Sequence, residues 1–415
     1  MAGVLPAAGR TQEGLRRRNL GALLGSLHLS GALTRAELTH RLGVNRSTVA
    51  ALVAELAALD AVEEERPAGA QGGAGRPSLM VKPCPERVQS VAAEIGVDRV
   101  DVALVGLGGS VLARRRHRLP TTTLEPAHVV AVVRVLVAQV LADPAAGEHL
   151  VGLGVALPGV VRSSDGCVRF APNLGWTDAP FGQLLVEAMG GLPVWVGNDA
   201  DLGALAEHLR GAGRGVDDLV FVAGEVGVGG GFVVGGHPLR GAGGYAGEIG
   251  HMVVRAGGRE CHCGSRGCWE TEIGFAAVSR ALGVDVREME DLLDRLRAAR
   301  AAGPVHEVPE LRDVGRYIGI GVGNLVNLLN PSLVLLGGLL REIHPLAAQA
   351  IAEGLAATAL RAPSVDVRVT VPTLGSDAVL MGAAEIVWQE LLADPVTSLR
   401  MAPRTRELRL LLGST

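Results

Sequence analysis

The chain has 415 residues, enough for two or three domains, and 48% of them are hydrophobic although only 3% are aromatic. It contains no run of about 18 uninterrupted apolar residues, which excludes a transmembrane helix. The N-terminal apolar run precedes the arginines at 16–18, the reverse of the order in a signal peptide. We therefore expect a cytoplasmic protein without membrane contacts, in which Cys84 and Cys167 are reduced.

The net charge of −4 is unevenly distributed along the chain. Residues 1–87 contain 11 basic and 8 acidic residues, whereas the remainder contains 28 and 35. A mildly basic N-terminal part on an acidic body fits a nucleic-acid-binding head, although such a small excess is weak evidence by itself.

Residues 1–13 are expected to be disordered, and residues 14–82 are expected to form a small helical domain with a β-hairpin. Apolar spacing predicts a first helix, Thr34 with Glu37 forms a capping box for a second, and Asn45 caps a third. Helix, glycine-containing turn and helix is the helix-turn-helix pattern. The predicted elements are helices at 14–29, 34–42 and 45–59, and strands at 61–63 and 78–81 around a Gly-rich tip at 67–75.

The third helix begins with short polar and basic side chains, which suit phosphates and base edges at the N-terminal end of a recognition helix. A lone arginine on the thin wing could enter a minor groove. The alternative is a domain that docks on a protein partner, with its basic residues merely solvated. On the DNA-binding interpretation the contacting residues are Arg35, Asn45, Arg46, Ser47, Thr48 and Arg76.

A linker at 83–87 leads to an α/β body at 88–392. One predicted strand delivers Asn198 and Asp199 at its carboxyl end, where an open α/β sheet presents functional groups. The alternative role of this pair is to cap the next helix, on whose surface we expect Glu207. The elements predicted in this half are two strands within 88–112, strands at 151–160 and 192–197, and a helix at 126–141.

In the second half, a strand at 219–222 runs into the glycine-rich stretch 224–231. Such a stretch often cradles phosphate with backbone N–H groups, and a hairpin is the alternative. The remaining predictions are helices at 275–300, 313–329 and 376–392, strands at 332–338 and 365–371, and a tail at 393–415 without a readable signal.

One histidine and three cysteines lie within eighteen residues of the stretch 247–270. A structural Zn²⁺ site needs four such protein ligands, and we expect one Zn²⁺ per chain. His262 is a rival fourth ligand, but it would be crowded between two ligating neighbours; three free thiols are the remaining alternative. The preferred ligands are His251, Cys261, Cys263 and Cys268.

This stretch resembles the signature of the ROK family (repressors, open reading frames and sugar kinases). The signature reads Glu-x-Gly-His, then Cys-x-Cys-Gly-x-x-Gly-Cys-x-Glu, and all its fixed positions are present between Glu248 and Glu270. The N-terminal pattern, with its Gly-Arg-Pro at 75–77, likewise resembles the winged helix fused to ROK repressors.

The resemblance implies a winged helix-turn-helix followed by a two-lobed, actin-like α/β domain of the hexokinase type, with a ribonuclease H-like ATPase fold. Lobe one would comprise 88–200 and the closing helix 376–392, and lobe two 201–375. The resemblance also places a sugar or sugar phosphate between the lobes, with Asp199 at the position of the kinases' general base. The implied sugar-binding residues are Asn173, Asn198, Asp199, Glu248, His251 and Glu270.

Two turns depart from the ROK kinase pattern. Asp98 stands where the first turn, Asp-x-Gly-Gly-Thr, has its Thr, and Glu225-Val226 stand where a later turn has Gly-Thr. Carboxylates at phosphate positions oppose ATP binding by like-charge repulsion. We therefore expect no catalytic residue, only a vestigial base at Asp199.

The expected function is that of a sugar-responsive repressor of carbohydrate genes, which binds operator DNA as a homodimer or homotetramer. One alternative is an ATP-dependent sugar kinase that carries a winged helix. Another is a scaffold whose head binds protein and whose cleft is empty.

Overall fold

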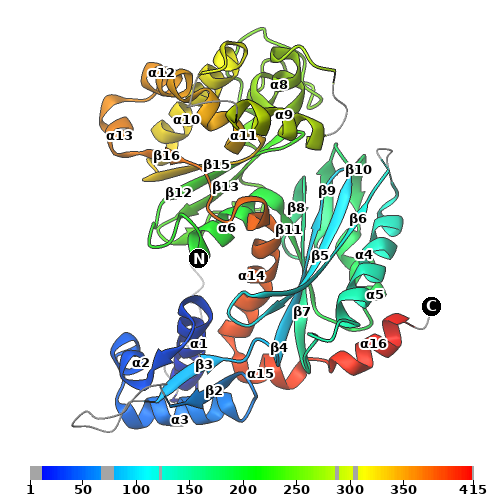
Figure 1. Cartoon of the computed structure of the whole chain (residues 1–415), viewed down its shortest axis with the longest axis vertical. Helices are drawn as coiled ribbons and strands as arrows, with labels where there is room; N and C mark the ends of the chain where they lie inside the picture. Colours follow the sequence, from blue (N-terminus) through cyan, green and yellow to red (C-terminus); the bar gives the residue numbers. More distant parts are fainter. Residues whose placement is uncertain (1–11, 67–78, 121–123, 286–288, 302–306, 414–415) are drawn as a thin grey trace, which may run out of the picture.

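The computed structural model describes residues 12–66, 79–120, 124–285, 289–301 and 307–413. Figure 1 shows a small N-terminal head, lobe one beside it, and lobe two at the far end of the molecule. None of the helices in these ranges combines the length and the apolar character that a membrane span needs. Arg76 and most of the predicted wing lie outside the described residues.

The head has the element order that its sequence predicts. Thr34 caps the second helix by accepting a hydrogen bond from Glu37 N, and Glu37 reaches back to Thr34 N at 2.7 Å. Gly43 ends that helix in the left-handed region, and Asn45 caps the next. The elements are α1 (Gln12–Ser30), α2 (Arg35–Leu42), α3 (Arg46–Ala57), β1 (Leu33–Thr34), β2 (Val62–Glu65) and β3 (Met80–Pro83), with the strands in the antiparallel order β1-β3-β2.

Lobe one is built on a five-stranded sheet in the order β11-β7-β4-β5-β6, in which β11, β7 and β4 are parallel. A smaller sheet, β10-β9-β8, borders the cleft between the lobes. The edge strand β6 was not predicted, because its four arginines hide the apolar alternation of a strand. The elements are β4 (Val88–Ile95), β5 (Arg99–Gly106), β6 (Val111–Arg118), α4 (Pro126–Leu141), β7 (His149–Leu157), β8 (Val160–Arg162), β9 (Cys167–Ala171), β10 (Trp176–Ala179), α5 (Phe181–Ala188) and β11 (Val194–Asn198).

Lobe two is built on a second five-stranded sheet, in the order β14-β13-β12-β15-β16, and helices cover its far side (Figure 1). Helix α6 (Asp199–Arg210) enters from lobe one and packs on β12 and β13. The strands are β12 (Leu219–Gly224), β13 (Val228–Val234), β14 (His237–Pro238), β15 (Leu333–Gly338) and β16 (Arg368–Thr370). The helices are η1 (Ile249–His251), α7 (Trp269–Ile273), α8 (Phe275–Ala281), α9 (Met289–Ala301), η2 (Pro309–Leu311), α10 (Arg312–Leu329), α11 (Leu339–Ile343), η3 (His344–Leu346), α12 (Ala348–Thr358), α13 (Arg361–Asp366) and η4 (Gly375–Asp377).

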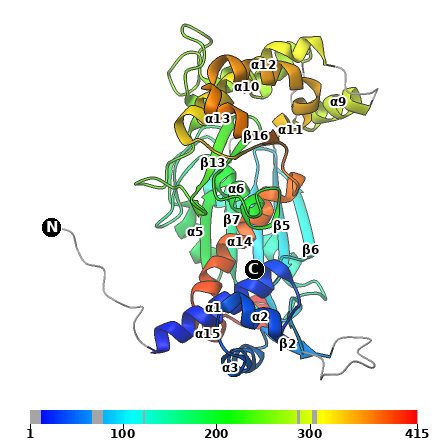
Figure 2. The ribbon, with the colours of Figure 1, turned by 90° about the vertical axis from the view of Figure 1, so that its left-hand side faces the viewer.

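The chain ends on helices that return to lobe one and the head. Helix α14 (Ala378–Ala393) runs from beneath lobe two to the head, where α15 (Pro395–Met401) lies against α1 (Figures 1 and 2). Helix α16 (Thr405–Gly413) packs on α4. The two-lobed α/β architecture is thus confirmed, and the stretch 393–415 adds two helices that the sequence did not reveal.

Several local predictions were wrong. The single helix expected at 275–300 is two helices, because Gly283 takes a φ of 62° after α8. The strand expected at 365–371 is only β16, preceded by α13. Glu207, expected on a helix surface, is fully buried, and it accepts hydrogen bonds from the backbone N–H groups of Leu374 (2.7 Å) and Ala212 (2.8 Å).

The glycine-rich stretch is a hairpin, as the alternative interpretation had it. Gly229 to Gly231 lie within β13 and pair antiparallel with β12. A Cβ at Gly231 would come within 2.2 Å of the Ala200 carbonyl oxygen, so the glycine lets α6 pack directly against the strand.

Candidate interlobe site and metal centre

The loop between η1 and α7 folds the cysteines toward one point. Isolated bridges join Val253 to Cys268 and Glu260 to Arg266. Gly267 takes a φ of 77°, and a Cβ there would meet the Arg255 carbonyl oxygen at 1.8 Å. Only glycine therefore allows this close turn beside the last cysteine.

The structure brings the four preferred ligands together. Donor atoms of His251, Cys261, Cys263 and Cys268 all lie within 4.8 Å of one another. His251 Nδ1 lies 3.6 Å from Cys261 Sγ, and the Sγ atoms of Cys263 and Cys268 are 3.7 Å apart. Two thiolates on one tetrahedral Zn²⁺ are separated by about 3.8 Å, given Zn–S bonds of about 2.3 Å. The donor set and its spacing therefore fit a metal ion.

His262 has a different place. Its Nδ1 lies 3.2 Å from Glu270 Oε1, and with that carboxylate and Cys261, which also belongs to the first cluster, it forms a second possible ligand group. His251 instead directs Nδ1 to the cysteines, while its Nε2 lies 3.8 Å from Glu248 Oε2. The imidazole thus lies between the Cys/His cluster and a carboxylate of the cleft.

A single interlobe cavity, which we name the cleft cavity, is lined by all six predicted sugar-binding residues. Its wall also includes Tyr245 and His262, which the sequence did not single out as cleft residues. Tyr245 belongs to no sequence motif that would indicate such a role, and His262 was considered only as a metal ligand. The six are Asn173, Asn198, Asp199, Glu248, His251 and Glu270.

Asn198 caps α6, as the alternative interpretation proposed. Its Oδ1 accepts hydrogen bonds from Ala200 N (2.9 Å) and Asp201 N (3.1 Å), and its Nδ2 donates to Gly159 O at 2.9 Å. Both the oxygen and the nitrogen of the side-chain amide thus form hydrogen bonds with the protein backbone. Asn198 therefore fixes the N-terminus of α6 at the wall of the cleft cavity, which it also lines.

Asp199 is the first residue of α6, and one carboxylate oxygen accepts from Ala200 N at 2.7 Å. Desolvation in the cleft, and next the charge of Glu225 across it, raise the pKa of Asp199 well above its usual range. This environment favours a protonated carboxyl, which can donate a hydrogen bond as well as accept one.

Glu270 is held in place from two sides. Its Oε2 accepts a hydrogen bond from Val228 N at 3.1 Å, at the start of β13, and its Oε1 faces His262. A Cβ at Gly227 would lie 2.4 Å from Oε2, so the glycine makes room for this carboxylate. The β12–β13 turn is therefore shaped around Glu270.

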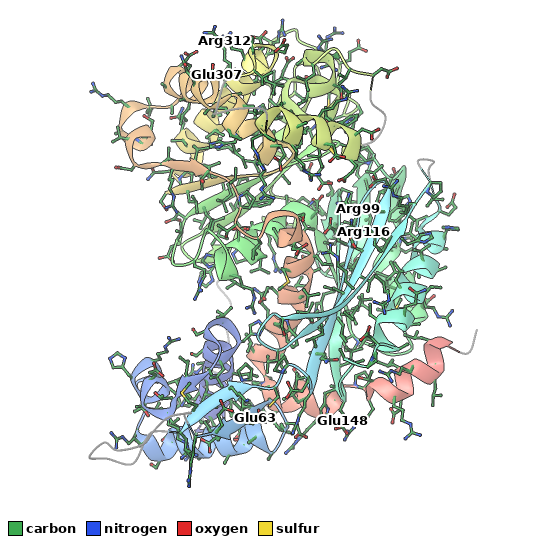
Figure 3. The ribbon with its side chains drawn as sticks, viewed as in Figure 1. Glu63, Arg99, Arg116, Glu148, Glu307 and Arg312 are labelled. Carbon is green, nitrogen blue, oxygen red and sulfur yellow. The ribbon has the colours of Figure 1, made fainter. Side chains whose placement is uncertain are left out.

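A second cavity, which we name the arginine cavity, contains the acids of both altered turns. Asp98 from lobe one and Glu225 from lobe two line it together with Gly338. Arg99 is the central cation there, and Figure 3 shows it beside Arg116, at the end of lobe one that faces lobe two. Further lining residues include Glu94, Asp101, Arg114, Arg297, Arg341 and Glu342.

Internal ion pairs line the arginine cavity. The guanidinium of Arg99 contacts Glu94 (3.2 Å), Asp98 (3.3 Å) and, more loosely, Asp101 (3.8 Å). Burial, followed by the charge of Glu225, raises the pKa of Glu94 to about 7. A polyphosphate entering this space would meet carboxylates and would have to displace them from their arginine.

In the head, α3 presents its N-terminal end to solvent. Asn45 Oδ1 accepts from Thr48 N (2.8 Å), Thr48 Oγ1 (2.9 Å) and Ser47 Oγ (2.7 Å), while Arg46 is exposed. Arg35 is paired with Glu64 of β2, with two contacts of 2.5 Å. The predicted DNA contacts therefore divide into free side chains, such as Arg46, and side chains with a structural partner.

The fold and its cleft define a protein of two α/β lobes, with a Cys/His cluster beside the interlobe cavity. The ROK family model matches residues 90–390, and the chain belongs to the ROK family. This confirms the family resemblance.

Relatives with and without the head are both found. The xylose repressor of Bacillus spizizenii is 26% identical over 383 residues, which cover 92% of this chain and 97% of the repressor. The glucokinase of Halalkalibacterium halodurans is 30% identical over 320 residues, which cover 72% of this chain and 95% of the glucokinase. The repressor thus aligns with more of the chain than the glucokinase does.

Solved structures also differ in how much of this chain they cover. A ROK family transcriptional regulator, described as a homologue of the Escherichia coli Mlc protein, has a TM-score of 0.74 at 24% identity and covers 93% of this chain and 99% of its own. A ROK family glucokinase from Streptomyces griseus, in complex with glucose and AMPPNP, has a TM-score of 0.60 at 27% identity and covers 72% and 99%.

Proposed function

We propose that the protein is a sugar-responsive transcriptional repressor of carbohydrate genes, in which the head binds operator DNA and the cleft cavity binds a sugar or sugar phosphate. One observation carries this proposal. The six side chains that suit a sugar line one cavity, whereas Asp98 lines the neighbouring one and Glu225 lies in the wall of both. The full-length similarity to xylose repressors supports it.

Zn²⁺ is the proposed metal, held by His251, Cys261, Cys263 and Cys268. With all four positions filled by protein it would be structural and would supply rigidity. The ligand loop lies between Glu248 and Glu270 in sequence, so a fixed loop keeps both carboxylates at the cleft cavity. Carboxylates held in this way can accept hydrogen bonds from several sugar hydroxyls.

The sugar's contacts come from both lobes. Asn173, Asn198 and Asp199 belong to lobe one and the start of α6, whereas Glu248 and Glu270 belong to lobe two. A ligand held by both sets favours the closed arrangement, and the equilibrium shifts only by its difference in affinity for the open and closed forms. In a homodimer or homotetramer, closure would change the spacing of two heads on DNA.

Sugar kinase activity is the second candidate function, because Asp199 is retained and ROK glucokinases are relatives. The ion pairs of Arg99 in the arginine cavity count against it. We propose that kinase activity has been lost and that the protein works in the cytoplasm on double-stranded DNA.

Fluorescence anisotropy with DNA from the gene's own upstream region tests the proposal. Near physiological salt we expect a saturable signal that survives competitor DNA, since non-specific binding weakens as salt rises. Xylose, glucose and their phosphates, added singly, should then identify a sugar that reverses the signal. ATP-dependent phosphorylation of a sugar, with no specific DNA binding, would instead establish the kinase.

A further inference from the structure

Helix α6 links the cleft cavity to the head. It begins at Asn198 and Asp199 on the cavity wall and ends at Arg210. Twelve residues at about 1.5 Å each span roughly 18 Å. Along this length α6 packs closely on α14, and a Cβ at Gly382 of α14 would lie 1.9 Å from the Leu202 carbonyl oxygen. The two helices therefore touch backbone to backbone.

At its far end, α6 meets the head in a buried polar junction. Arg210 donates from Nε to Glu385 Oε1 on α14, and from Nη1 to the carbonyl oxygens of Gly108 (2.9 Å) and His28 (3.3 Å). His28 belongs to α1 of the head, and its Nε2 lies 3.1 Å from Glu385 Oε2. One arginine thus contacts the head, lobe one and the closing helix together.

The imidazole of His28 has a defined role in this junction. Its Nδ1 accepts a hydrogen bond from Gly108 N at 2.9 Å, while its Nε2 lies 3.1 Å from Glu385 Oε2 and 2.5 Å from Arg210 Nη2. The side chains of His28 and Glu385 are 0% and 1% exposed, and that of Arg210 is 13% exposed. Buried polar and charged groups packed this closely hold the elements that carry them in one relative orientation.

The head is pressed against α14 rather than attached only by its connecting segment. A Cβ at Gly21 of α1 would lie 2.0 Å from the Leu392 carbonyl oxygen. The ring centroids of His28 and Trp388 are 5.3 Å apart, and Cys84, in the segment that joins head and body, is fully buried. The head must therefore follow any movement of α14 or break this contact.

We propose that His28, Glu385 and Arg210 are positioning residues that transmit sugar occupancy of the cleft cavity to the orientation of the DNA-binding head. The inference rests on the proposed function and identifies its coupling element. A sugar that shifts the Asp199 end of α6 shifts Arg210 at the other end, because the helix is short and backed by α14. His28 follows because it shares both Glu385 and Arg210.

The quantity to measure is the coupling factor, which is the ratio of the DNA dissociation constants with and without saturating sugar. We compare the parent protein with Glu385→Gln and His28→Gln. Both variants should bind DNA alone and sugar alone within about threefold of the parent, while the coupling factor falls toward 1. Sugar affinity with and without DNA must change by the same factor, which supplies an independent check.

Arg17→Ala is the matched control. Arg17 also joins the head to the C-terminal helices, through Asp394 at 3.0 Å, but it is 51% exposed and its ion pairs are with Glu13 and Asp394 rather than with residues of α6. This variant should keep the parental coupling factor. Full coupling in both junction variants, or an equal loss in the control, would overturn the proposal.

Two further outcomes are separable. Glu385→Gln removes the negative charge that is paired with the buried Arg210, so this variant could fail to fold. In that case His28→Gln carries the test, because it removes no carboxylate. A parent protein whose DNA affinity no sugar changes would overturn the proposed function, and the inference with it. Coupling in the parent that persists in His28→Gln would overturn the inference alone.

Discussion

The cleft cavity and the arginine cavity lie side by side between the same two lobes. They differ in whether their carboxylates are already paired with another side chain. In the cleft cavity, Glu270 and Asp199 are oriented by backbone N–H groups and face a hollow. In the arginine cavity, Glu94 and Asp98 are paired with Arg99 of the same lobe. In the first cavity the carboxylates thus face open space, while in the second they pair with an arginine. On the proposed function, this difference separates ligand recognition from phosphoryl transfer within one fold.

The largest expected effect comes from removing one of the proposed metal ligands beside the cleft cavity. Cys268 is fully buried in the ligand cluster, so Cys268→Ala should abolish stoichiometric Zn²⁺ and, with it, the placement of Glu270. Loss of a structural metal removes several kcal/mol, and we expect the Tm to fall by about 10 °C or more. Metal content and thermal unfolding measure this. Cys167→Ala, outside the cluster, should retain the metal; equal metal content in both variants would contradict the assignment.

Asp199→Asn separates affinity from stability. The environment favours a protonated Asp199, and a hydrogen bond between neutral groups contributes up to about 1.5 kcal/mol, so sugar affinity measured by calorimetry should fall by up to about tenfold. Stability at pH 8 should rise, because a carboxyl with a raised pKa is disfavoured when it ionises in the folded protein. Asp178→Asn changes an exposed carboxylate and should alter neither quantity. Unchanged sugar binding in Asp199→Asn would remove this residue from the site.

Glu94→Gln tests the arginine cavity by its pH dependence. The pKa of Glu94 rises from an ordinary 4.5 to about 7 on folding, so its contribution to stability is full below pH 4.5 and is lost as the pH rises through 7. The amide avoids that loss. The variant should therefore be more stable than the parent by about 3 kcal/mol at pH 8 and by less than about 1 kcal/mol at pH 5. Denaturant unfolding at the two pH values measures the difference, and a gain independent of pH would show that burial of this carboxyl is not its cause.

The smallest expected effect concerns DNA binding by the head. Arg46 is exposed at the start of α3, and Arg46→Ala should weaken DNA binding about fivefold to tenfold and reduce the slope of log affinity against log salt by about 1. Arg312→Ala, in lobe two, should leave the DNA affinity unchanged, since this exposed side chain pairs with Glu353 far from the head (Figure 3). Equal losses in the two variants would indicate non-specific attraction.

The features that the sequence predicted best are those that depend on residues close together along the chain. The capping box of Thr34 and Glu37 and the cap at Asn45 join residues three apart, so their spacing is sufficient evidence. The clustering of the predicted metal ligands was also predictable, because a short loop brings these side chains together. Glu207 was misjudged because the backbone it accepts from, near Leu374, lies more than 160 residues away.

Other features depend on tertiary contacts that no local pattern records. The two C-terminal helices form because the head and α4 cover their apolar sides, and Leu408 and Leu412 of α16 are buried there. The sequence identified Asp98 and Glu225 as obstacles to phosphate, but their shared cavity and the ion pairs of Arg99 required the structure. The junction at His28 joins segments from three distant parts of the chain.

The most direct test of the account is a titration of the protein–DNA complex with its effector sugar, with and without Mg²⁺-ATP, while ADP is measured in the same sample. The account predicts release of DNA at the same sugar concentration in both cases and no sugar-dependent ADP. Sugar-dependent ADP production, or a release that requires ATP, would contradict the claim that one half of the cleft senses sugar while the other has lost the nucleotide.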